Sequence, residues 1–158
     1  MIKTEAIILK SVGSNEVDRL LTVYSEKLGK INVSAKGVKK IESKLRYSVE
    51  PISYVKMILV EGKNFLILKD AILIDQFLDI KKDLKKIKIA KELMKMIDEA
   101  IVGEEGDEDI WKLILGTFKL LDSVDPAYAK ASVGKFQKKL IGLLGYDPEE
   151  VKNIENIY

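Results

Sequence analysis

The sequence predicts an α+β protein with a small β-barrel in its first half and a helical unit in its second. Apolar residues tend to alternate up to about residue 77, which is typical of half-buried strands. Beyond that point they recur at intervals of three and four residues, which is typical of helices. The 158 residues are 47% hydrophobic and 33% charged, as expected of a globular chain rather than a disordered one. We therefore expect two domains, residues 1–77 and residues 78–158.

Five segments of the first half have the pattern of strands. The clearest is residues 30–36, where Ile31, Val33 and Ala35 would face a core while the residues between them face solvent. The other four are residues 4–10, 20–25, 52–60 and 65–69, with a hairpin turn expected at residues 61–64. Five strands in about 75 residues suit a closed barrel of the OB type, because closure removes exposed sheet edges.

Three helices are expected in the second half. The first carries two adjoining apolar stripes, namely Leu84, Ile87, Ala90, Met94, Ile97 and Ile101, and beside them Ile89, Leu93, Met96 and Ala100. The second follows an acidic stretch at residues 103–109, interpreted as an exposed connection, and has acidic residues at its start. The third is expected to begin with Asp125 as its cap and Pro126 in its first turn, and to end at Gly145.

The composition excludes several classes of function. The chain has no Cys and no His, which removes disulfides, thiolate nucleophiles, imidazole catalysis and zinc sites built from these residues. Most enzyme mechanisms thereby lose their usual central residue. Our prediction for this chain is no catalytic residue, no metal and no cofactor. The apolar run at residues 6–9 is too short for a secretion signal, and no stretch is long enough to span a bilayer. A cytoplasmic location is therefore expected.

Basic residues gather in one part of the predicted barrel. Between Lys27 and Arg46 the chain has seven basic residues and one acidic residue. Such ammonium groups could replace counterions along a phosphate backbone, and OB barrels bind single strands on their second and third strands with bases stacked on aromatic rings. Tyr24 and Tyr54, together with Tyr47, are the candidates for stacking. Alternatively, the lysines only keep the surface solvated and the tyrosines belong to the core.

Other groups of residues give weaker signals. Asp79 and Asp83 share the start of a helix and could serve a metal-dependent hydrolase, but no neighbouring residue would separate their pKa values, so a solvated first turn is the preferred interpretation. The acidic residues 104–109 lack the ligand spacing of a calcium loop. Trp111, Met94 and Met96 lie at helical spacing and are expected in the core. An apolar groove between helices is the alternative, and it would make the protein an adaptor that docks a partner peptide.

Several segments, taken in order, resemble the RecO family of bacterial DNA repair and recombination-mediator proteins. They include Asp18-Arg19-Leu20-Leu21-Thr22, Leu28-Gly29-Lys30, Ala35-Lys36-Gly37 and Leu143-Leu144-Gly145-Tyr146-Asp147-Pro148. The resemblance covers essentially the whole chain. It implies an OB-fold domain followed by a helical domain, without catalytic turnover.

The resemblance also implies a function and its residues. Such proteins bind single- and double-stranded DNA, anneal complementary strands and, with a RecR-type partner, help load a RecA-type recombinase on DNA coated by single-strand-binding protein. The family's basic surface would correspond here to Lys10, Arg19, Lys36, Lys39, Lys40, Lys44 and Arg46, and the charge cluster adds Lys30. Many family members continue with a pair of CxxC zinc motifs, whereas this chain has no Cys. No zinc is expected here. The resemblance leaves open whether the contact with single-strand-binding protein is retained.

Overall fold

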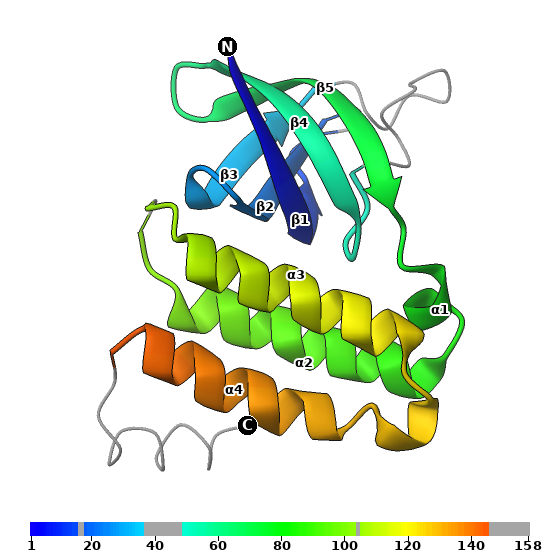
Figure 1. Ribbon diagram of the computed structural model, residues 1–158. Helices are drawn as coiled ribbons and strands as arrows, with labels where there is room; N and C mark the ends of the chain where they lie inside the picture. The colour runs from blue at the N-terminus through cyan, green and yellow to red at the C-terminus, as the bar shows by residue number, and fades with distance from the viewer. Residues whose placement is uncertain (16–17, 37–48, 104, 146–158) are drawn as a thin grey trace. The chain divides into compact units, whose positions relative to one another are not determined.

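The N-terminal half of the computed structural model is a closed five-stranded barrel (Figure 1). The structure describes residues 1–15, 18–36, 49–103 and 105–145. The strands are β1 (Ile2–Gly13), β2 (Arg19–Ser25), β3 (Gly29–Ala35), β4 (Tyr54–Glu61) and β5 (Leu66–Asp75). They close in the order β1-β2-β3-β5-β4, and every pair is antiparallel except β3 and β5. This confirms the predicted OB-type barrel.

Alternating apolar side chains fill the barrel. On β3 the side chains of Ile31, Val33 and Ala35 belong to the core, as predicted from their spacing. The other strands contribute Ala6, Ile8, Leu21, Val23, Val55, Met57, Leu59 and Leu68. Burying each large apolar side chain stabilises the fold by about 1.5–3 kcal/mol. Because the interior is packed with these residues, groups that contact a ligand must lie on the outer side of the strands or in the loops.

A β-bulge in β1 determines which way its second half faces. Ile8 lies opposite Val23 on β2, and Lys10 lies opposite Thr22, so Leu9 has no partner on that strand. Ile8 faces the core, and strict alternation would turn Lys10 toward the core as well. The extra residue reverses the alternation. Lys10 therefore leaves the barrel on its outer side and is exposed.

The strand ends differ from the predicted ones for local reasons. Strand β4 begins at Tyr54 rather than at Ile52, because Ile52 has a left-handed backbone with φ of 61° and its amide donates to the carbonyl of Ile8 instead. The hairpin between β4 and β5 is where it was predicted, with Glu61 opposite Leu66. Strand β5 begins one residue later than expected and continues to Asp75.

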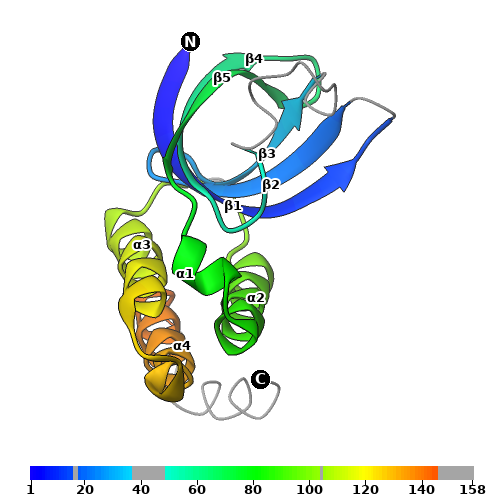
Figure 2. The same ribbon diagram turned by 90° about the vertical axis from the view of Figure 1, so that its right-hand side faces the viewer.

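The second half of the chain is helical, as predicted (Figures 1 and 2). Its helices are α1 (Leu78–Lys81), α2 (Leu84–Ala100), α3 (Glu108–Ser123) and α4 (Ala131–Leu143), with a 3₁₀ turn η1 (Pro126–Tyr128) before α4. The short α1 was not predicted, since four residues are too few for a periodic pattern. Asp125 caps η1 rather than α4, and Gly145 follows α4 with the expected left-handed φ of 78°. No helix in the described ranges is long and apolar enough to cross a membrane.

Polar contacts join α1, α2 and α3. The carboxylate of Asp83 caps α2 by accepting from the amide of Lys86 at 3.0 Å. The buried Nζ of Lys86 donates to the carbonyl of Asp122 on α3 at 3.1 Å, and the Asp122 carboxylate accepts from the amide of Ile80 on α1. The predicted stripe was wrong at Leu84, which is 77% exposed, while the expected core positions Trp111, Met94 and Met96 are buried.

The connection between α2 and α3 packs against the barrel. The chain divides into two compact units, and residues 103–107 group with residues 1–76 in the first. A Cβ built on Gly29 in the β2–β3 turn would collide with the carbonyl of Glu105, and one built on Gly106 would collide with the carbonyl of Lys27. The predicted exposed connection is thus exposed in part, but its main chain lies directly on the β2–β3 turn. The domain boundary at residue 77 stays a prediction.

Replacing Gly29 with alanine should destabilise the barrel. The residue has a φ of 70°, and a left-handed backbone alone costs a non-glycine residue about 1–2 kcal/mol, before the collision with Glu105 is added. Gly116→Ala on α3 is the matched control, because nothing lies within 4 Å of its added Cβ and alanine favours a helix by about 1 kcal/mol. Denaturant titration of both variants measures the two effects. A Gly29→Ala variant as stable as the parent chain would contradict this packing.

Candidate nucleic-acid interface

The outer side of strands β1, β2 and β3 gathers most of the predicted basic residues that the structure describes. Cross-strand pairing aligns Lys10, Thr22 and Asn32 in one row, and Val12, Leu20 and Ser34 in the next. Alternation along β3 places Lys30 on the same side, and Lys36 follows directly after the strand. We call this surface the β1–β3 face, made of Lys10, Val12, Leu20, Thr22, Lys30, Asn32, Ser34 and Lys36.

The β1–β3 face is positively charged, and each of its residues is exposed or half-buried. Lys10, Asn32 and Lys36 are exposed, and Val12 is 49% exposed. None of its eight residues is acidic. Neighbouring strands lie about 5 Å apart and a strand rises about 3.3 Å per residue, so Lys30 and Lys36 are roughly 20 Å apart along β3. Ammonium groups spaced in this way can contact phosphates that lie several nucleotides apart along an extended polynucleotide.

Arg19 was predicted on the same surface but lies apart from it. By alternation along β2, Arg19 lies on the same side of the strand as Leu21, which faces the core. Lys10 instead lies on the outer side of β1. Its guanidinium donates through Nε to the hydroxyl of Ser11 and through Nη2 to the carbonyl of Ser11 at 3.1 Å. These two bonds hold Arg19 against β1 near the β1–β2 turn.

The remaining basic residues of the predicted surface lie outside the residues that the structure describes. They are Lys39, Lys40, Lys44 and Arg46, and Tyr47 lies there with them. Their role in binding stays a prediction from the sequence. Since Lys36 is the last described residue before them, they follow in the chain directly after the β1–β3 face.

The predicted stacking role of Tyr24 and Tyr54 is wrong, because both side chains are buried. Tyr24 has no exposed area and Tyr54 is 7% exposed. Burial, with a smaller effect from the negative charge of Asp107, raises the pKa of the Tyr24 hydroxyl to about 12. Burial likewise raises the pKa of Tyr54, whose hydroxyl donates to the Glu5 carboxylate at 2.6 Å. Neither ring presents a face to a nucleotide base.

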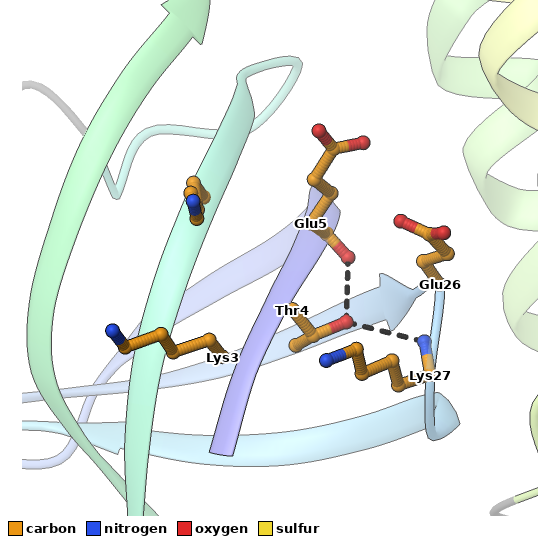
Figure 3. Close-up of a pocket in the computed structure, with 6 residues that line it drawn as sticks. Lys3, Thr4, Glu5, Glu26 and Lys27 are labelled. Atoms are coloured by element: carbon orange, nitrogen blue, oxygen red, sulfur yellow. Dashed lines mark hydrogen bonds between the residues drawn. The ribbon is translucent and has the colours of Figure 1, made fainter. Parts of the chain in front are cut away.

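A shallow depression on β1, β4 and the β2–β3 turn has a different character (Figure 3). It measures about 350 Å³ and is lined by Lys3, Thr4, Glu5, Glu26, Lys27 and Lys56. The hydroxyl of Thr4 donates to the carbonyl of Glu5 and accepts from the amide of Lys27, both at 3.1 Å, which ties the turn to β1. Because carboxylates lie among its lysines, this depression is less suited to a polyanion than the β1–β3 face.

The acidic residues that suggested a hydrolase have structural positions. Asp83 is the N-cap of α2, and Asp79 lies in the first turn of α1, where a negative charge favours the helix dipole. Among the described residues, no group of three or more acidic side chains is arranged to hold a metal ion. The geometry thus assigns these carboxylates to the helix ends.

A closed five-stranded barrel with a lysine-bearing outer face on its first three strands defines an OB-fold domain, here followed by helices. Residues 1–77 match the family described as "Recombination protein O N terminal". The chain carries this RecO N-terminal domain, and the resemblance to the RecO family is confirmed.

Comparisons with individual proteins agree with this family. The chain is 33% identical over 149 residues to the DNA repair protein RecO of Caldanaerobacter subterraneus, and 32% identical over 149 residues to that of Heliobacterium modesticaldum. It is 28% identical over 147 residues to that of Acetivibrio thermocellus. These alignments cover 93–94% of this chain and 53–59% of the relatives. The chain therefore spans little more than half the length of the relatives it matches.

Tyr24 should ionise late in an alkaline titration. Its folded-state pKa of about 12 lies above the ordinary value of 10.0, so the folded state retains the proton more strongly than the unfolded state does. The resulting stabilisation is complete below pH 10 and is lost as the pH rises toward 12. The ultraviolet absorbance of tyrosinate follows the ionisation. Tyr24→Phe should remove one tyrosine ionisation from the high-pH end of this titration curve. An unchanged late region of the curve in this variant would show that Tyr24 is not the group responsible.

Proposed function

We propose that this chain is a non-enzymatic DNA-binding protein of DNA repair and homologous recombination. It binds single- and double-stranded DNA through the β1–β3 face, anneals complementary strands and assists the loading of a recombinase. The observation that carries the proposal is the β1–β3 face itself, where lysines and no acidic residues line the outer side of an OB-type barrel. The relatives, which are named DNA repair proteins, support the same role.

The chemistry of this face favours binding to the nucleic-acid backbone. Lysine ammonium groups act as point charges toward phosphates, whereas reading base edges usually requires the forked donors of arginine or amide side chains. Lys10, Lys30 and Lys36 are of the first kind, and the one amide of this face, Asn32, already accepts through its oxygen from the hydroxyl of Thr22. The face should thus bind DNA with little dependence on sequence, as a strand-annealing protein requires.

The absence of turnover is part of this proposal. The chain has no His or Cys, the side chains most used for general acid–base and nucleophilic steps. The proposed partners are those that the RecO resemblance implies, a RecR-type mediator protein and, as a further candidate, single-strand-binding protein. The division of labour between an OB-fold domain at residues 1–77 and a helical domain at residues 78–158 belongs to the same proposal.

Removing two lysines from the β1–β3 face should weaken DNA binding and its salt dependence. Each phosphate of a single strand that is no longer neutralised lowers the salt slope by about 0.7, so Lys10→Gln with Lys36→Gln should reduce it by roughly 1.4. The matched control is Lys3→Gln with Lys56→Gln, which removes the same charge at the depression. Fluorescence anisotropy of a labelled oligonucleotide over a salt series measures both. Equal losses in the two double variants would show that net charge, not this face, determines binding.

Strand annealing by the same variants tests the finer activity. Two complementary oligonucleotides with donor and acceptor dyes report pairing by energy transfer, and the parent chain should accelerate it. The Lys10→Gln, Lys36→Gln variant should be slower, while the control variant keeps the parental rate. The adaptor function predicts a different outcome. The parent chain would then not accelerate annealing, and the Lys10→Gln, Lys36→Gln variant would still bind a RecR-type partner although its DNA binding falls.

A further inference from the structure

We infer that Phe65, in the turn between β4 and β5, is the residue on which the protein stacks a base of single-stranded DNA. This inference rests on the proposed function and deepens it, because it names a base contact beside the lysines of the β1–β3 face. Phe65 is 42% exposed and lies just before β5. The tyrosines predicted for this role are buried, so Phe65 is the one exposed aromatic side chain in the described part of the barrel.

The pairing of β3 with β5 places Phe65 next to the β1–β3 face. Val33 lies beside Leu66 and Ser34 beside Ile67 in parallel register. Extending this register back by one residue sets Phe65 beside Asn32. Leu66 packs on the barrel core, so alternation turns Phe65 to the outer side, where the side chain of Asn32 also lies.

Phe65 thereby completes a row across the face. The row begins with Lys10 on β1, continues through Thr22 and Asn32, and ends at the aromatic ring. Thr22 donates from its hydroxyl to the Asn32 amide oxygen at 3.2 Å, which links the middle of the row. An exposed lysine, Lys63, lies two residues before the ring and adds a positive charge on that side.

The turn that carries Phe65 is closely packed. A Cβ built on Gly62 would collide with the carbonyl of Phe65 and meet the side chain of Ile67 at 2.8 Å. Glycine at this position lets the turn fold back against its own chain. A ring carried on a turn packed in this way loses little freedom when a base stacks on it, which favours binding.

The chemistry of the row distinguishes single strands from duplexes. Every base has a π-face, so stacking on a phenyl ring tolerates any sequence, and lysines on both sides can hold the neighbouring phosphates. In a duplex the bases are already stacked on one another. The ring therefore contributes only to single-strand binding, whereas the lysines contribute to both.

The test compares an oligo-dT with an abasic oligonucleotide of equal length, bound by the full chain and measured by fluorescence anisotropy. Phe65→Ala should weaken binding of oligo-dT by roughly 5- to 150-fold, the range expected for loss of one base stack. It should change binding of the abasic strand and of duplex DNA less than twofold. Phe65→Leu should weaken oligo-dT binding as much as Phe65→Ala does, since leucine keeps apolar bulk without a ring. Phe65→Trp should bind oligo-dT about as tightly as the parent chain.

The control is Ile72→Ala, which removes another exposed apolar side chain, opposite Lys56 on the barrel, and should leave all three affinities unchanged. Oligo-dT binding that survives Phe65→Ala, or an equal loss on the abasic strand, would overturn the stacking role while leaving the lysine surface intact. Failure of the parent chain to bind any of the three DNAs would instead contradict the proposed function itself. Thermal unfolding of each variant verifies that the fold is kept.

Discussion

The position of β1 between two partners is the constraint on which the rest of the barrel depends. It pairs with β4 through its first half and with β2 through most of its remaining length, so its register fixes both neighbours at once. The bulge at Leu9 lies within this strand. Because a single inserted residue exchanges the inner and outer sides, it allows Ile8 to fill the core and Lys10 to join the surface. Core packing and surface charge are therefore set by the same local irregularity.

Close main-chain packing adds a second constraint at the other end of β2 and β3. Gly29 and Gly106 each lie against a carbonyl of the opposing segment, so the connection between α2 and α3 rests on the β2–β3 turn. Asp107 belongs to this connection, and its charge acts on the buried hydroxyl of Tyr24. A stretch that reads as an acidic linker thereby becomes part of the barrel unit.

Much of the fold could be predicted from the sequence, because burial imposes simple periods. Alternation on β3 identified Ile31, Val33 and Ala35 as core, and the spacing of three and four identified the long helices. The outward lysines of β3 followed from the same alternation. The bulge at Leu9 could not be predicted, since it lies in the apolar run Ile7-Ile8-Leu9, where no alternation is visible.

The proposed stacking residue was missed in the sequence. Tyr24 lies on the outer side of its strand by alternation, yet its side chain is buried, and periodicity carries no information on what covers an outer side. Phe65 reads as the first residue of a strand, and only the register of β3 with β5, extended back by one residue, places it beside Asn32.

The proposed binding mode also explains how one surface could serve annealing. A protein that covers base edges must release a strand before the strand can pair, whereas phosphate contacts leave those edges accessible. Lys10, Lys30 and Lys36 supply contacts of the second kind, and one ring at Phe65 can engage only one base at a time. The bases on either side stay available to a complementary strand. As a duplex forms, that base returns to its stack and the contribution of the ring to binding is lost, and this loss favours release after pairing.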